Sequence, residues 1–429
     1  MHVDGKTIFA VASGAGRAAV TVVRLSGSDA GQVLDRLCTR PPARMAQLRA
    51  LRDAAGDVLD RALVLWLPGP GSYTGEDSAE LHLHGGSAVL SAVSDALVAS
   101  GARPAEPGEF TRRAFLNGRM DLIEAEAVAD LIAAETDAQR RQALRQLDGA
   151  LGTILQNWAT RLTRLLAQQE ALIDFPDEDL PPEIDAALLA EISALESEIS
   201  ALLDDGRRGE RLRDGLVFAV VGPPNAGKST LVNALAARDV AIVSASPGTT
   251  RDVLEIRLDL GGVPVTLLDT AGLRETTDEV EAEGVRRARA RMADADCCLV
   301  IAGPMDRFEP MLGVETMLIR TKSDLGQRYD GVISVSAATG AGMDRLRTEL
   351  AERARAMTQA AGPPPLTRAR HRAALLEAVA RLQAAIGAGL PELRGEDMRL
   401  ALRAIGRVTG AVGVEDILDS VFRQFCIGK

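Results

Sequence analysis

The sequence predicts a multidomain α/β protein, with an α+β domain at the N-terminus, an all-α domain, and an α/β domain inserted into the helical one. The first observation is the length of 429 residues, which exceeds what one hydrophobic core normally serves. The second is that the spacing of apolar residues changes three times along the chain. Helical patterns flank the α/β segment on both sides, which indicates an insertion because the two ends of a domain often lie close together.

Each segment has its own pattern. In the first, "AAVTVVRLSG" and "RALVLWLPG" predict strands and "AVLSAVSDALVAS" predicts a helix. In the second, apolar residues recur at helical spacing from Leu144 to Leu165 and from Leu188 to Leu203, and "DFPDEDLPPE" separates these two long helices. Strands then alternate with helices, as in a parallel sheet, until "AGPPP". The predicted segments are 1–118, 119–213, 214–355 and 356–429.

Composition narrows the class of protein. Hydrophobic residues make up 46% and charged residues 25%, which is typical of a folded globular chain. The net charge of −11 argues against a broadly basic nucleic-acid coat, although it permits a local basic patch. Without a long apolar run or a basic leader, we expect a cytoplasmic protein and no membrane partner. The four cysteines, Cys38, Cys297, Cys298 and Cys426, show neither a zinc pattern nor a disulfide framework.

"LVFAVVGPPNAGKST" is an apolar strand that runs into the pattern G-x-x-x-x-G-K-S. Gly222 and Gly227 permit the tight turn in which backbone N–H groups cradle phosphates. Lys228 reaches the β- and γ-phosphates, and Ser229 offers a hydroxyl to Mg²⁺. The helix that follows directs its positive N-terminal dipole at the same phosphates. This stretch therefore predicts a P-loop.

Three further motifs follow in order. In "DTAG", Asp269 can hold the magnesium shell and the Gly272 amide can sense a γ-phosphate. In "TKSD", Asp324 can accept both donors of the guanine edge, and "VISVSA" supplies a backing loop. The ordered set predicts a GTPase and resembles the translation-factor-like P-loop GTPases. It departs from their usual N-K-x-D because Thr321 stands first; a threonine can still hydrogen-bond across the loop. The candidate GTP-binding residues are Asn225, Ala226, Gly227, Lys228, Ser229, Thr230, Ser244, Ala245, Ser246, Pro247, Gly248, Thr249, Thr250, Asp269, Thr270, Ala271, Gly272, Thr321, Lys322, Ser323, Asp324, Ser336, Ala337 and Ala338.

The glutamine that positions the attacking water in many GTPases is missing from this sequence. Leu273 follows Gly272 where many GTPases carry glutamine, and Thr250 is the candidate switch threonine on Mg²⁺. Acidic residues after this point are candidates, although a solvated helix face is the commoner role of such residues. They are Glu275, Asp278, Glu279, Glu281 and Glu283.

Longer stretches carry a more specific resemblance. "PGSYTGEDSAELHLHGG", "PGEFTRRAFLNGRMDLIEAEAVADLI", "DFPDED", "PGTTRDV", "DTAGLRETTDEVE" and the terminal "FCIGK" are similar to the MnmE (TrmE) family of bacterial tRNA modification GTPases. The resemblance covers the whole chain. It implies a folate-binding N-terminal domain that dimerises, a helical domain, and an inserted Ras-like P-loop GTPase domain.

The resemblance also implies an activity and its partners. It implies a homodimer that hydrolyses GTP with K⁺ and Mg²⁺ and forms a heterotetramer with the flavin-dependent MnmG. Together they add a carboxymethylaminomethyl-type group to C5 of the wobble uridine (position 34) of certain tRNAs. The one-carbon donor is a tetrahydrofolate derivative, 5-formyl- or 5,10-methylenetetrahydrofolate.

Residue roles follow from the same resemblance. Glu281 matches the catalytic glutamate, and Lys228 holds the phosphates. Cys426 is placed near the one-carbon unit, where chemistry and simple packing are equally weighted alternatives. The implied K⁺ ligands are Asn225, Ser244, Ser246 and Thr249, and the implied folate contacts are Arg24, Glu80, Arg119 and Lys429. The chain end is expected to fold back onto the folate pocket, anchored by Val414, Ile417, Leu418, Val421, Phe422 and Phe425.

Two other functions remain open at this level. An Era-like ribosome-assembly GTPase shares the nucleotide motifs but has no need of the N-terminal segment or the "CIGK" end. A nucleotide-switched scaffold requires only slow hydrolysis. For tRNA, "QRRQALRQ" and "GRRGERLRDG" are candidate contacts, with solvated helix faces as the favoured interpretation.

Overall fold

The computed structural model describes most of the chain, and its described residues fall into two compact units. Unit 1 comprises residues 1–129, 147–171 and 395–429, and unit 2 comprises residues 130–146 and 172–394. The described residues are 5–14, 16–174, 182–238, 255–269, 295–304, 315–325, 332–359, 364–412, 418, 421–423, 425–426 and 428.

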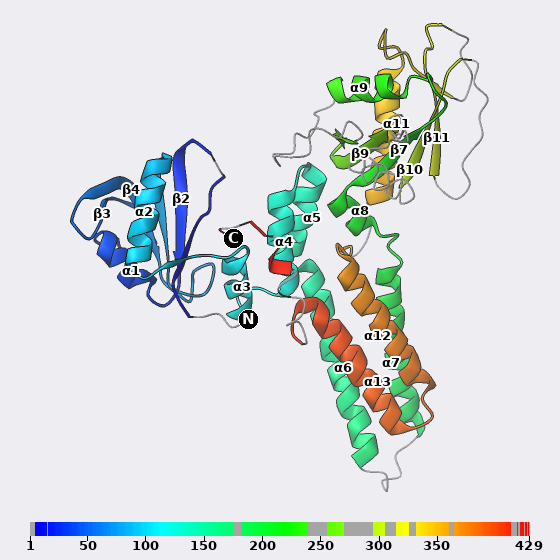
Figure 1. Ribbon diagram of the computed structural model, residues 1–429. Helices are drawn as coiled ribbons and strands as arrows, with labels where there is room; N and C mark the ends of the chain where they lie inside the picture. Colours follow the sequence, from blue (N-terminus) through cyan, green and yellow to red (C-terminus); the bar gives the residue numbers. More distant parts are fainter. Residues whose placement is uncertain are drawn as a thin grey trace, which may run out of the picture. The chain divides into compact units, whose positions relative to one another are not determined.

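Unit 1 begins with a six-stranded sheet in the order β3-β4-β5-β2-β1-β6, antiparallel except where β1 meets β6. Its strands are β1 (Ile8–Val11), β2 (Ala18–Ser26), β3 (Gln47–Arg52), β4 (Val58–Leu67), β5 (Ser78–Gly85) and β6 (Arg103–Pro104). Helices α1 (Ala30–Leu37) and α2 (Ser87–Ala99) bury their apolar sides against one face (Figure 1). Because side chains alternate along a strand, Val23 and Leu25 enter this core while Arg24 points to the other face.

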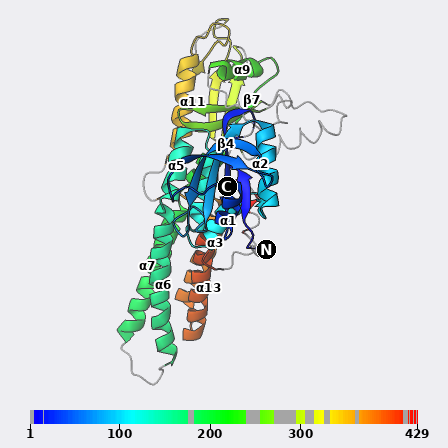
Figure 2. The same cartoon turned by 90° about the vertical axis from the view of Figure 1, so that its left-hand side faces the viewer.

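The apolar run from Leu144 to Leu165 predicts one continuous helix. That prediction is wrong: α5 (Asp137–Leu147) ends there and α6 (Ala150–Asp174) begins again. Gly149 lies between them with φ of 75°, a left-handed conformation that interrupts a helix. In unit 1, α6 runs beside α13 (Pro391–Thr409), joined by an ion pair between Glu170 and Arg399 (Figure 2).

The chain end packs within unit 1. Leu418, Val421, Phe422 and Phe425 form a buried cluster with Leu122, in agreement with the apolar spacing of this stretch. The cluster joins it to the two helices that follow the sheet, α3 (Glu109–Leu116) and α4 (Leu122–Ala133). Val414 and Ile417 lie outside the described residues.

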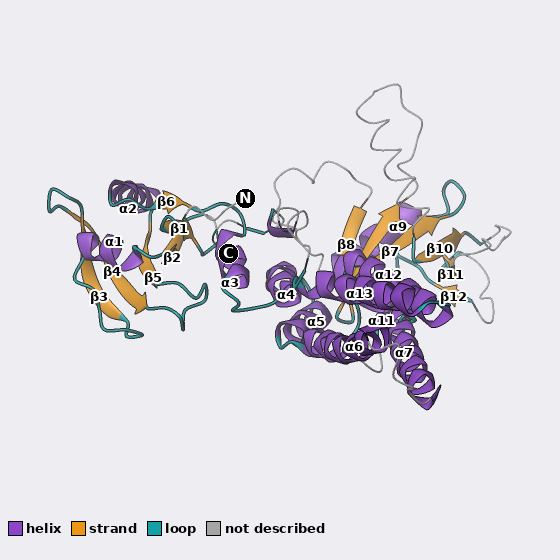
Figure 3. Cartoon of the chain, turned by 90° about the horizontal axis from the view of Figure 1, so that it is seen from below, coloured by secondary structure: helices purple, strands orange, loops and turns teal. Residues whose placement is uncertain are grey.

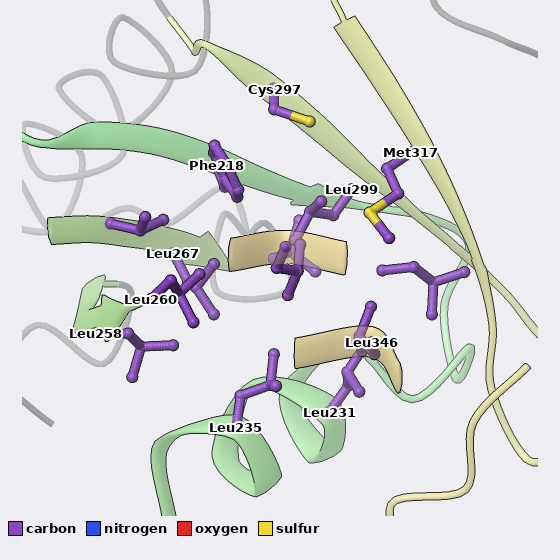
Figure 4. Close-up of a cluster of buried hydrophobic side chains, with 14 of the residues drawn as sticks. Phe218, Leu231, Leu235, Leu258, Leu260, Leu267, Cys297, Leu299, Met317 and Leu346 are labelled. Carbon is purple, nitrogen blue, oxygen red and sulfur yellow. The ribbon is translucent and has the colours of Figure 1, made fainter. Parts of the chain in front are cut away.

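Unit 2 contains the second six-stranded sheet, in the order β12-β11-β10-β7-β9-β8, parallel except for the β8–β9 hairpin. Its strands are β7 (Leu216–Val221), β8 (Glu255–Leu260), β9 (Val263–Asp269), β10 (Cys297–Ala302), β11 (Glu315–Arg320) and β12 (Ile333–Ser334). Helices α9 (Lys228–Arg238) and α11 (Met343–Thr358) pack on it (Figure 3). Figure 4 shows Leu231 and Leu235 of α9 facing Leu267 and Leu299 of the strands. The order is that of a doubly wound nucleotide-binding sheet, in which ligands bind at the carboxyl ends of the strands.

Helix α5 is hydrogen-bonded to the two chain segments that lead into and out of this sheet. Three glutamines spaced along one helix face each donate from Nε2 to a backbone carbonyl at 3.0 Å. The pairs are Gln139 with Arg213, Gln142 with Gly209, and Gln146 with Pro365. The remaining helices of unit 2 are α7 (Pro182–Leu203), α8 (Arg208–Asp214) and α12 (Ala369–Gly387).

Within the described part of the chain, no helix has the length and apolar character needed to span a membrane.

Candidate functional site

The P-loop lies between β7 and α9, at the carboxyl end of a central strand. Gly222 has φ of 154°, and a Cβ there would lie 2.2 Å from the Ile301 carbonyl oxygen, so only glycine fits. Asn225 adopts a left-handed φ of 61°. Lys228 is only 8% exposed, and its Nζ donates to the carbonyls of Gly222 and Pro223 at 2.9 and 3.0 Å. The ammonium group is thus held inside the loop that would surround the phosphates.

A hydroxyl and a carboxylate meet beside this loop. Ser229, in the first turn of α9, donates from Oγ to Oδ2 of Asp269 at 2.6 Å. Strand β9, which ends at Asp269, pairs directly with β7, and this pairing brings the two residues together. Oxygen ligands of this kind are the ones that Mg²⁺ prefers, so the described residues fit that ion.

The guanine-motif loop contacts the P-loop directly, although 95 residues separate them in the chain. The Thr321 hydroxyl donates to the Ala226 carbonyl, and Lys322 Nζ donates to the Asn225 carbonyl at 2.8 Å. Thr321 therefore does make a hydrogen bond across the loop. Both lysines that fall in motifs hold P-loop carbonyls in place.

Asp324 is prepared to act as an acceptor. A hydrogen bond from the Ser336 side chain lowers the pKa of the Asp324 carboxyl below its ordinary value, so the group is ionised near neutral pH. Ser336 is itself buried, and its backbone is fixed in a turn with Gly340 and Ala341. Ser323 also donates from its backbone N–H to the Val335 carbonyl at 3.1 Å. The Asp324 carboxylate is exposed and ionised, so it can accept from two adjacent donors.

A second polar site lies in unit 1, on the sheet face opposite α1 and α2. Arg24 and Glu80 are direct partners in the β2–β5 register. Arg24 donates from Nε and Nη2 to Oε1 of Glu80 at 3.1 and 2.9 Å. The guanidinium lies over the rings of Tyr73 and Phe110, 5.5 and 6.0 Å from their centroids. The site combines donors, an acceptor and aromatic surface.

The comparisons with known proteins cover the whole chain. Residues 7–119 match the family described as "GTP-binding protein TrmE N-terminus", and residues 122–426 match the "MnmE helical domain". The chain is 62% identical to the tRNA modification GTPase MnmE of Gluconacetobacter diazotrophicus and 55% identical to that of Rhodospirillum rubrum, with 100% of each chain covered. This chain belongs to the MnmE family.

A solved structure also shows a weaker similarity than these MnmE relatives. The G domain of the T. maritima FeoB iron transporter is 24% identical to this chain, covering 34% of it and 99% of that domain, with a TM-score of 0.24. The full-length match to MnmE proteins favours that family over an Era-like protein, since it includes the N-terminal segment and the chain end.

The MnmE resemblance implies folate contacts, of which Arg24, Glu80 and Arg119 are among the described residues. Arg119 is exposed, and its side chain packs against Gly75. Gly75 follows Tyr73 by two positions in the chain, and the Arg24 guanidinium lies over the Tyr73 ring. Oε1 of Glu80 is engaged by Arg24, while Oε2 faces His82 Nε2 at 3.4 Å. A carboxylate has more acceptor sites than these contacts use, so the residues present fit a pterin ring.

The chain end reaches the same sheet. The Gly108 N–H donates to the Cys426 carbonyl at 3.4 Å, and Gly428 lies so close to β1 that a Cβ would be 2.1 Å from the Val11 oxygen. Strand β1 is the neighbour of β2, which carries Arg24. The predicted return of the tail to the N-terminal domain is therefore present for the described residues. Cys426 is exposed and its thiol is free.

Several predicted site residues lie outside the described residues. They are Ser244, Ala245, Ser246, Pro247, Gly248, Thr249, Thr250, Thr270, Ala271, Gly272, Glu281 and Lys429. Tyr73 and Phe110, in contrast, were not predicted and are brought to the site by the fold. The sequence contains only two tyrosines, and this rarity was the one feature that could have drawn attention to Tyr73. Among the described residues, no three His, Cys, Asp or Glu side chains form a metal-binding group.

Proposed function

We propose that this chain is a potassium-dependent GTPase that modifies tRNA with the flavin-dependent partner MnmG. The pair adds a carboxymethylaminomethyl-type group to C5 of the wobble uridine, with a tetrahydrofolate one-carbon donor. The observation that carries the GTPase part is the pair of hydrogen bonds from Thr321 and Lys322 to the P-loop carbonyls. These bonds join the loop that carries Asp324, the proposed guanine acceptor, to the proposed phosphate loop, which supports the assignment. The full-length match to MnmE proteins supports the tRNA part.

Each residue then has a role in the proposal. Lys228 neutralises phosphate charge, and Ser229 with Thr250 would hold Mg²⁺. Potassium would supply positive charge near the transferred phosphate, held by Asn225, Ser244, Ser246 and Thr249. Glu281 would orient the attacking water. We propose a cytoplasmic homodimer that forms a heterotetramer with MnmG.

GTP turnover is expected to be faster in KCl than in NaCl at equal ionic strength, because Na⁺ is smaller than the shell that K⁺ fills. Glu281→Ala is expected to reduce turnover by roughly 10²-fold while nucleotide binding persists, as when only a transition-state interaction is lost. Steady-state phosphate release measures both. Equal rates in the two salts contradict the potassium role, and normal turnover of the variant moves the water-positioning role to another acid.

Glu80→Ala is expected to abolish binding of 5-formyltetrahydrofolate, because it removes the pterin acceptor and leaves Arg24 without its partner. Isothermal titration measures the affinity. Asp60→Ala is the matched control, since Asp60 accepts from His84 on the neighbouring strand and lies outside the Arg24 site. Unchanged binding in Glu80→Ala, or no binding to the wild type, contradicts the assignment.

The tRNA function is tested by mass spectrometry of nucleosides from cells that lack this chain. We expect the C5-substituted wobble uridine to disappear and to return with the wild-type gene. An unchanged wobble nucleoside overturns the proposed function.

A further inference from the structure

A cavity of about 310 Å³ lies inside unit 2, apart from the nucleotide site. Its walls come from α5, the turn between β8 and β9, and the end of α11. Three arginines line it, Arg141, Arg145 and Arg355, together with Gln142, Gln359 and backbone at Gly261. None of the described residues that line it carries a carboxylate. The volume is in the range of sites that accept small groups.

The positive charge of this cavity is only partly neutralised. Arg141 pairs with Asp137 of the same helix. Arg355 donates from Nε to the Gly261 carbonyl at 3.1 Å, a bond that orients the guanidinium and leaves its charge. Among the described residues, Arg145 and Arg355 form no ion pair. The cavity therefore carries a local positive charge in a chain whose net charge is −11.

The two arginine-rich stretches of the sequence therefore differ in use. In "GRRGERLRDG", three arginines are committed to carboxylates: Arg207 to Glu210, Arg211 to Asp296, and Arg213 to Asp130, at 2.7, 2.9 and 2.9 Å. In "QRRQALRQ", the glutamines hold backbone carbonyls while Arg145 remains available at the cavity. The first stretch is therefore held in ion pairs, whereas in the second Arg140 and Arg141 pair with Asp137 and Arg145 remains exposed at the cavity.

We propose that this cavity binds a phosphate group of the tRNA backbone. Guanidinium groups match phosphate geometry and keep their charge, and an RNA strand supplies phosphates that a surface-open cavity of exposed arginines can admit. The proposal rests on the tRNA function proposed above. A phosphate held there contacts α5 on one side and the nucleotide-binding sheet, through Arg355 and the β8–β9 turn, on the other. Bound tRNA thus reaches the GTPase fold directly.

The test is the affinity for tRNA, measured by fluorescence anisotropy across a range of KCl concentrations. Arg145→Gln and Arg355→Gln are each expected to raise the Kd by about 5-fold, and each lowers the salt slope by about one. Arg145→Lys keeps most of the affinity because the charge remains. Arg345→Gln, exposed on α11 and not part of the cavity, is the matched control and binds like the wild type. Basal GTP turnover checks that each variant is folded.

Three outcomes overturn the proposal. Variants that bind tRNA like Arg345→Gln show that the cavity does not contact the backbone. If inorganic phosphate raises the Tm of the wild type but not of the Arg145→Gln/Arg355→Gln variant, with tRNA affinity unchanged, the cavity takes a small anion instead. A wild type that binds no tRNA, alone or with MnmG, overturns the cavity and the proposed function together, whereas in the first two outcomes normal wobble modification leaves the proposed function standing.

Discussion

Asp324→Asn is expected to weaken GTP binding by at least about 100-fold, because the guanine N1–H and 2-amino donors lose a charged acceptor for two hydrogen bonds. An amide presents one acceptor and one donor. That pattern matches xanthine, which carries an oxygen in place of the 2-amino group. We therefore expect the variant to bind XTP better than GTP. Titration with fluorescent GTP and XTP analogues gives both affinities.

A change of preference from GTP to XTP shows that the variant is folded and that only recognition of the base has changed. The P-loop contacts of Thr321 and Lys322 do not involve the Asp324 side chain, so the phosphate site stays intact. Asp95→Asn, at an exposed position on α2, removes the same charge and should change neither affinity. A variant that retains full GTP affinity, or one that loses both nucleotides, shows that Asp324 does not read the base.

Gly428→Ala is expected to abolish wobble-uridine modification while GTP hydrolysis is retained. The added Cβ would lie 2.1 Å from the Val11 carbonyl oxygen, and φ at this residue is 101°, which a side chain rarely adopts. The tail must then leave β1 without the loss of Cys426 or Lys429. Deletion of residues 426–429 is expected to give the same result, because both changes remove the tail from the site beside Arg24. Wobble nucleosides and phosphate release measure the two activities.

Cys426→Ser tests the thiol separately. Its backbone carbonyl, which accepts from Gly108, is unchanged by the substitution, so the tail keeps its place. Retained modification assigns Cys426 to packing, and lost modification with folate still bound assigns it to chemistry. Normal modification by both Gly428→Ala and the deletion shows that the chain end is not part of the site.

The sequence predicted those strands and helices whose formation depends on the spacing of apolar residues within one short stretch of the chain. The strands around Arg24 and before Gly222 form where alternating or continuous apolar runs predict them, because each must bury one or both faces. The single helix predicted from Leu144 onward was wrong, since apolar spacing does not register a left-handed glycine at 149. The bounds of the four predicted segments remain predictions.

The candidate site was predictable where a motif fixes its own geometry. The P-loop places Lys228 and Ser229 through a turn that only glycines permit. Contacts between distant segments were not predictable in this way. The pairing of Arg24 with Glu80 depends on strand register, and the stacking on Tyr73 depends on a loop returning to the sheet. Arg24 and Glu80 are 56 residues apart, so no short turn between β2 and β5 fixes this register locally.

The chain segments that enter and leave the nucleotide-binding sheet are both bonded to α5 and lie side by side. The part of the chain between them could therefore be removed as one piece. Arg372 Nη2 lies 2.5 Å from Asp205 Oδ1, and a Cβ at Gly209 would lie 2.3 Å from the Leu366 oxygen, so the two connections touch backbone to backbone. A loop of a few residues could splice them after excision, because closing a short gap costs little chain entropy. Gain, loss or exchange of the GTPase domain by insertion or deletion in the gene would thus leave helices α7 and α12 in place, because these two helices already pack together.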